Sequence, residues 1–232
     1  MLNITNLRAI FVACLTALSL NAMANPTYYA TLGASVLTSH NTYHENTSQI
    51  YIEKHATTSS YLQVGFGLNI WRNQRFSWNI GLQGLSSLGQ KQTGQFGVIY
   101  GNTHYQETNF QYKVSSYALL LENTLHYHFS VNNRFSPFVR LGLGWVNNRS
   151  SGFQTTSNDG IKSQIEYPTQ NDLAWEIFAG TRYTLTTHNS LAVGVGYRDL
   201  GNTAVTLNIF SNTPAKTPLR STSAEISYRY QF

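Results

Sequence analysis

The sequence contains few charged residues, a single cysteine and, beyond its first segment, no long apolar run. Charged residues make up 11% of its 232 positions, less than half of the roughly 25% usual in soluble globular domains. The single cysteine, Cys14, lies in the first segment, so disulfide bonds play no part in the rest of the chain. No later stretch approaches the roughly 18 consecutive apolar residues of a membrane-spanning helix. These shortages argue against an ordinary soluble domain and exclude a helical membrane protein.

Aromatic and small polar residues are abundant instead. Aromatics reach 13% of the sequence, with 15 Tyr among them, and the mean hydropathy is -0.25. A neutral mean hydropathy with little charge is typical of a β-barrel whose strands alternate between lipid and a polar interior. A soluble β-sandwich could share part of this composition, but it normally carries more charge on its surface.

The start of the chain has the pattern of a secretory signal peptide. Arg8 supplies a positive charge, residues 9–20 are apolar, and Ala22-Met23-Ala24 has the small-residue spacing of a cleavage site. We therefore expect a signal peptide over residues 1–24 and a barrel domain over residues 25–232. The small basic excess of the remaining chain is scattered, without a Lys/Arg run. Together with export, this makes nucleic acid an implausible partner.

Alternation of apolar and polar residues predicts an all-β fold, an eight-stranded antiparallel transmembrane β-barrel. The clearest strand carries Leu62 and Val64 on one face and Gln63 and Gly65 on the other. An added hairpin that includes residues 96–100 would give a ten-stranded alternative. The eight expected strands lie near residues 28–37, 60–70, 76–83, 116–129, 139–145, 175–183, 191–198 and 224–232.

Short and long connections alternate strictly between these strands. The short connections are residues 72–75, 130–136 and 186–190. The long, polar connections are residues 38–59, 89–113, 147–171 and 201–218. This alternation matches the short periplasmic turns and longer extracellular loops of bacterial outer-membrane barrels. It predicts that both termini lie in the periplasm.

Aromatic residues cluster where the expected strands enter and leave their apolar stretch. Their amphipathic rings suit the boundary between membrane and water. They are Trp71, Phe76, Trp78, Phe129, Phe138, Trp145, Trp175, Tyr183 and Tyr230.

Three segments carry a resemblance to a known family. They are residues 226–232 (ISYRYQF), 137–145 (PFVRLGLGW) and 195–198 (VGYR). With them the chain resembles the small outer-membrane barrels of the OmpA-like and OmpX-like type. The resemblance implies the bacterial outer membrane as location, and lipid and lipopolysaccharide as neighbours. It also implies a signal for the barrel-assembly machinery, formed by Tyr228, Tyr230 and Phe232.

Seven charged residues fall on the inward faces of the expected strands. Charges inside a barrel should be paired, because pairing offsets their loss of hydration. We expect them to form a network that plugs the barrel, since eight strands leave an interior just wide enough for side chains. A gate in a narrow ion path is the alternative. The seven residues are Glu122, Arg140, Glu176, Arg182, Arg198, Glu225 and Arg229.

Candidates for catalysis and metal binding are weak. His126 and His128 share one strand face, but no third metal ligand is identifiable, and interior packing is the preferred interpretation. His188 precedes a serine, and Asp199 or Glu176 could orient it in a triad, yet no acid lies near it in the sequence. We therefore expect no enzyme activity, metal or cofactor.

The long connections contain tyrosine and phenylalanine among Asn, Thr, Ser and Gln. Such residues make adaptable contact surfaces, although loops can also merely shield a barrel rim and vary freely. We expect a structural or surface-interaction role with an extracellular ligand or host surface first. A narrow pore is second and a lipid-modifying enzyme third. The aromatic residues are Tyr43, Tyr51, Tyr100, Tyr105, Phe110, Phe153 and Tyr167.

Overall fold

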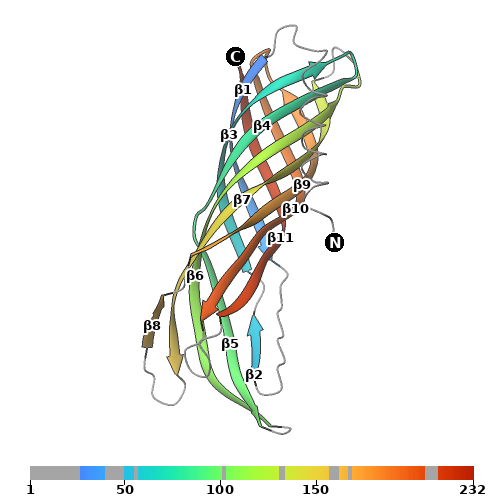
Figure 1. Cartoon of the computed structure of the whole chain (residues 1–232). Helices are drawn as coiled ribbons and strands as arrows, with labels where there is room; N and C mark the ends of the chain where they lie inside the picture. The colour runs from blue at the N-terminus through green and yellow to red at the C-terminus, as the bar shows by residue number, and fades with distance from the viewer. Residues whose placement is uncertain are drawn as a thin grey trace, which may run out of the picture.

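A computed structural model shows a closed antiparallel barrel with a sheet that extends from one end (Figure 1). It describes residues 27–39, 50–54, 57–100, 103–130, 134–156, 162–166, 169–206 and 214–232. Within these residues no helix is long and apolar enough to cross a membrane. The strands are β1 (Thr27–Ser39), β2 (Ile50–Lys54), β3 (Thr57–Arg72), β4 (Phe76–Ser87), β5 (Gln90–Tyr100), β6 (Thr103–Tyr127), β7 (Phe135–Thr156), β8 (Lys162–Glu166), β9 (Gln170–Thr184), β10 (Asn189–Thr206) and β11 (Pro214–Gln231).

Eight of the described strands form the barrel wall, as the sequence predicts. Their order around the wall is β1, β3, β4, β6, β7, β9, β10 and β11, and every neighbouring pair is antiparallel. The wall closes where β1 pairs with β11, from Tyr29↔Gln231 to Thr38↔Thr222. Closure leaves no free strand edge in the wall, so each backbone polar group there has a partner strand on both sides.

The distribution of buried and exposed side chains is the reverse of that in a soluble protein. Leu62, Val64 and Phe66 on β3 are about half exposed, whereas Gln63 between them is buried. The same alternation occurs on β7, where exposed Leu141 follows buried Arg140. Since side chains alternate along a strand, this pattern places an apolar surface outside and a polar lining inside.

The two ends of the barrel differ. The short connections and the C-terminus of β11 lie at one end of the barrel, which we call the turn end (Figure 1). We call the opposite end the loop end. At the turn end, the Asn73 side-chain oxygen accepts hydrogen bonds from the backbone N–H groups of Arg75 (2.8 Å) and Phe76 (2.6 Å). This bonding pattern is the reason asparagine is favoured in tight turns.

At the loop end, much of what the sequence predicts as loop is paired strand. β5 pairs with the first half of β6, β2 pairs with β5, and β8 pairs with the far end of β7. The hairpin with residues 96–100 therefore exists, but it extends the sheet and does not enter the wall as in the ten-stranded alternative. The sequences of β2, β5 and β8 do not alternate regularly between apolar and polar residues, so the pattern that identifies the wall strands misses them.

Aromatic rings lie at two levels on the outer surface. Near the turn end Phe76 packs against Tyr127, with ring centroids 5.2 Å apart. Nearer the loop end Trp175 packs against Tyr197 at 5.4 Å. Phe138 is an exception to the predicted girdle, since it is buried inside the barrel. The parity of β7 requires this, because Phe138 and Arg140 are two residues apart and share the inward face.

Candidate functional site: the barrel interior

The interior contains a cluster of ionisable side chains at mid-height. The register brings two of its members together directly, because Arg198 on β10 is the cross-strand partner of Glu176 on β9. Gly142 on β7 lies between Glu122 and Glu176 on the two adjoining strands. A Cβ atom on Gly142 would lie 2.7 Å from the Glu176 Cγ atom, so a glycine at this position leaves the space for the Glu176 side chain.

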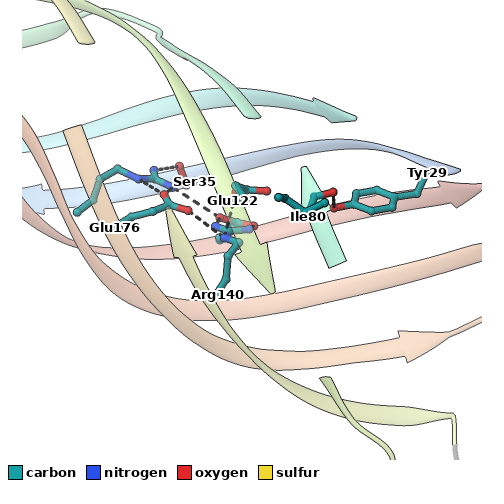
Figure 2. A network of polar contacts seen from close by, with 8 residues as sticks. Tyr29, Ser35, Ile80, Glu122, Arg140 and Glu176 are labelled. Atoms are coloured by element: carbon teal, nitrogen blue, oxygen red, sulfur yellow. Dashed lines mark hydrogen bonds and ion pairs between the residues drawn. The ribbon is translucent and has the colours of Figure 1, made fainter. Parts of the chain in front are cut away.

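Arg140 is the centre of the cluster (Figure 2). Its Nε atom lies 3.2 Å from Glu122 and 2.9 Å from Glu176, and its terminal nitrogens form a two-point contact with the Glu225 carboxylate. Arg198 completes the cluster, with its Nε atom donating to Glu176 at 2.8 Å. Two-point pairing of arginine with a carboxylate gives both strength and a fixed geometry.

A ring and a hydroxyl support the two arginines. The guanidinium groups of Arg140 and Arg198 both lie over the Phe178 ring, 4.7 and 5.0 Å from its centroid. Arg198 also donates to the Ser35 hydroxyl at 3.2 Å. The cluster therefore joins β1, β6, β7, β9, β10 and β11 across the interior, and its members are all nearly inaccessible to solvent.

The other two inward arginines lie outside this cluster. Arg229 is buried with its guanidinium over the Tyr29 ring, 3.4 Å from the centroid. Among the described residues, neither Arg182 nor Arg229 forms an ion pair with an acidic group. Of the seven predicted charges, five are thus brought together and these two lie towards the turn end.

An apolar layer fills the interior on the loop-end side of the cluster. Leu120, an apolar residue on the otherwise polar inward face of β6, is 0% exposed and belongs to this layer. The signal was its parity with Ala118 and Val114, two and six residues earlier on the inward face of β6. The layer consists of Leu37, Tyr61, Leu85, Val114, Ala118, Leu120, Val146, Ala174, Leu200 and Leu219.

The candidate catalytic and metal-binding residues are not assembled into a site. The His188 Nδ1 atom lies 2.8 Å from the Gln231 carbonyl oxygen at the turn end. Asp199 instead accepts a hydrogen bond from Arg220, and Glu176 belongs to the ion cluster. In the described parts of the chain, no group of three or more His, Cys, Asp or Glu residues could hold a metal.

Five of the seven aromatic residues expected on the long connections lie on described strands. Tyr43 and Tyr167 lie outside the described residues, as does the expected signal peptide over residues 1–24. The other aromatic residues of the long connections lie on β2, β5, β6 and β7. The residues expected to form the assembly signal, Tyr228, Tyr230 and Phe232, are all exposed on the outer surface.

Comparison with known proteins agrees with a barrel that has an apolar outer surface and a polar interior. A sequence profile described as the outer membrane protein beta-barrel domain matches residues 10–232. The chain belongs to this family. The barrel described above is therefore an integral protein of the bacterial outer membrane. A search of curated proteins finds no match.

Several solved structures are similar to this chain at low sequence identity. OprG from Pseudomonas aeruginosa has a TM-score of 0.50 at 14% identity, covering 89% of this chain and 95% of that one. Neisserial surface protein A (NspA) has a TM-score of 0.44 at 14% identity, covering 88% and 97%. Ail, the attachment invasion locus protein of Yersinia pestis, solved with the heparin analogue sucrose octasulfate, has a TM-score of 0.37 at 10% identity, covering 89% and 98%.

Proposed function

We propose that this outer-membrane barrel is a closed anchor that holds its long hairpins as a binding surface outside the cell. The observation that carries the proposal is the length of two strands. A strand needs only about 9–11 residues to cross a bilayer, whereas β6 has 25 and β7 has 22. The two remain paired from His126↔Phe138 to Thr108↔Thr156. Their excess length is a preformed sheet beyond the membrane, available to an extracellular ligand or host surface.

The proposal includes an orientation. The turn end faces the periplasm and the loop end faces the outside, because outer-membrane barrels have short turns on the periplasmic side. Residues 1–24 are removed as a signal peptide on export. Tyr228, Tyr230 and Phe232 on the last strand then meet the barrel-assembly machinery from the periplasm. Lipopolysaccharide surrounds the loop end.

The composition of the long connections indicates how the surface recognises its ligand. Between residues 38–59, 89–113, 147–171 and 201–218 there are five acidic and six basic residues, so these segments are almost neutral. Tyrosine, asparagine, threonine and glutamine recognise partners by hydrogen bonds and ring contacts. Salt screens charge–charge attraction far more than such contacts. We therefore expect binding through this surface to change little between 0.05 and 0.5 M salt, roughly.

Trimming the hairpins is the test of this function. A variant with Asn-Gly in place of residues 91–113 joins the cross-strand pair Gln90↔Val114 by a two-residue turn. A second variant with Asn-Gly in place of residues 152–165 joins Ser151↔Glu166 in the same way. We expect both to fold, because the barrel wall is intact, and at least one to lose most of the binding of the parent. Binding is measured with protein-bearing vesicles on immobilised extracellular-matrix proteins and glycans.

The mobility shift of a folded barrel on heating is the folding control for these variants. Retention of full binding by both trimmed variants would overturn the proposed role of the hairpins. Absence of binding by the folded parent to every immobilised probe would overturn the surface-interaction role itself.

The filled interior leads to a separate expectation about conductance. The ion cluster and the apolar layer with Leu120 follow one another along the barrel axis, and both are closed to solvent. A dry apolar layer excludes hydrated ions. Refolded protein in a planar bilayer is expected to show no discrete conductance steps. Reproducible steps from a demonstrably folded sample would favour the narrow pore.

A further inference from the structure

A second feature of the interior is a cavity at the turn end. Its volume is about 380 Å³, and among the described residues that line it there are three arginines and no acid. The arginines are Arg72, Arg182 and Arg229, and the rest of the wall is hydroxyl, amide and imidazole groups. A smaller cavity of about 40 Å³ lies next to the ion cluster, and Arg182 and Arg229 line both spaces.

Arg182 and Arg229 differ from the arginines of the ion cluster. Arg140 and Arg198 have carboxylates at ion-pair distance, whereas neither Arg182 nor Arg229 has one among the described residues. The Nε atoms of Arg182 and Arg229 are buried and have no hydrogen-bond partner there either. Both residues line the same two cavities, so their like charges face a shared space and repel each other. Glu122 attracts Arg229 at longer range, but its ion pair is with Arg140. Unpaired charges removed from water cost free energy, which a bound counter-charge offsets.

The sequence around the cavity adds to this positive charge. The turns at residues 72–76, 128–135 and 185–189 contain Arg72, Arg75 and Arg134, and none of them contains Asp or Glu. Two of the three turns therefore add positive charge at the turn end, and the third adds no negative side chain. Such a concentration of one sign attracts anions from solution.

His128 helps to shape the wall of the cavity. Its ring nitrogens contact the hydroxyls of Ser77 at 3.0 Å and Ser136 at 2.9 Å, on the two strands beside it. Burial, followed by the nearby charges of Arg72 and Arg182, lowers the pKa of His128 below its usual value. The imidazole is thus a neutral bridge between hydroxyls, and the guanidiniums supply the charge.

We propose that the turn-end cavity binds a phosphate group, with Arg182 and Arg229 as the guanidiniums that pair with it. The planar guanidinium fork matches a phosphate at two points. Serine and threonine hydroxyls on the wall are further donors. The volume lies near the lower limit of small-molecule sites, so the site takes a phosphate or a small phosphate ester. The orientation proposed above makes the periplasmic side the source, either as a solute or as a phospholipid headgroup.

The test is calorimetric titration of the full chain, refolded in a phosphate-free maltoside detergent, with inorganic phosphate. We expect saturable binding, which Arg182→Gln and Arg229→Gln each weaken roughly 10- to 100-fold. Arg75→Gln is the matched control, because it removes the same charge at the same end from a residue that does not line the cavity. It should change the affinity less than about threefold. Phosphate should also raise the melting temperature of the parent but not of Arg182→Gln.

A second arm distinguishes the sources of the phosphate. Native mass spectrometry with added phosphatidylglycerol detects binding of a phospholipid headgroup. If Arg182→Gln loses this binding and Arg75→Gln keeps it, the site is supported and a lipid is the source of the phosphate. An equal loss in all three variants would show diffuse attraction to the rim and overturn the proposal. So would the absence of binding of both probes to the folded parent. The hairpin-trimmed variants should bind phosphate normally, so this test fails independently of the surface-interaction role.

Discussion

Replacement of Arg140 by methionine is expected to lower the free energy of unfolding by about 3–5 kcal/mol. Arg140 contacts the carboxylates of Glu122, Glu176 and Glu225. Without it, three buried carboxyl groups would face the single guanidinium of Arg198. Methionine is an unbranched side chain that keeps much of the arginine volume, so most of the loss reports unpaired charge and not a void. Equilibrium urea unfolding in lipid vesicles, followed by tryptophan fluorescence, measures the change.

Glu122→Gln is the matched control for this prediction. Glu122 has one ion pair, at 3.2 Å, whereas the Glu225 carboxylate meets Arg140 at two points. The variant leaves two carboxylates facing two guanidiniums, and the glutamine oxygen can still accept a hydrogen bond. We expect a change of less than about 1 kcal/mol. A loss of similar size in both variants, or a negligible loss for Arg140→Met, would show that the balance of charge does not hold the interior together.

A lysine at position 141 is expected to destabilise the barrel by about 2–4 kcal/mol more than an alanine there. Leu141 is exposed on β7 between the aromatic residues Phe135 and Trp145, six residues after the first and four before the second. This places it near the centre of the apolar band, where a cationic side chain is far from water on both sides. Unfolding of Leu141→Lys and Leu141→Ala in the same vesicles gives the difference.

Position 135 provides the comparison at the edge of the band. Phe135 begins β7 and packs against Tyr183, with ring centroids 4.8 Å apart. Lysine there should cost no more than about 1 kcal/mol beyond alanine, because its amine reaches water. Each lysine variant is compared with alanine at the same position, so the loss of the native side chain, including the packing of the Phe135 ring, does not enter the difference. An equal penalty at the two positions would contradict the placement of the bilayer on the barrel.

The wall of the barrel is predictable from the sequence because lipid imposes a strict condition on it. Every second residue of a wall strand must be apolar, so Leu62 and Val64 define the outer face and Gln63 the inner one. The same parity assigns Arg140 inwards. It assigns Phe138 inwards too, and the buried ring shows that parity outweighs the preference of aromatic rings for the membrane surface at this position.

The pairing inside the barrel is less predictable. Which charges meet depends on the register between strands distant in sequence, such as Arg140 on β7 and Glu225 on β11, 85 residues apart. Alternation along single strands contains no information on that register. The alternation therefore assigns Arg182 and Arg229 to the same inward network as Arg140, although in the structure they lie outside the ion cluster. Alternation also fails to predict the sheet at the loop end, since no contact with lipid requires an apolar residue at every second position of its strands.

The ion cluster also makes the last folding step depend on strands from both ends of the chain. Arg140 finds Glu225, and Arg198 finds Ser35, 163 residues away, only when the first and last strands have both joined the wall. A partial barrel would hold these guanidiniums next to its open seam with part of their partners absent. The closing step thus completes the backbone pairing of β1 with β11 and the charge pairing of the lumen together. Such coupling makes closure cooperative, with few stable intermediates between an open sheet and the finished protein.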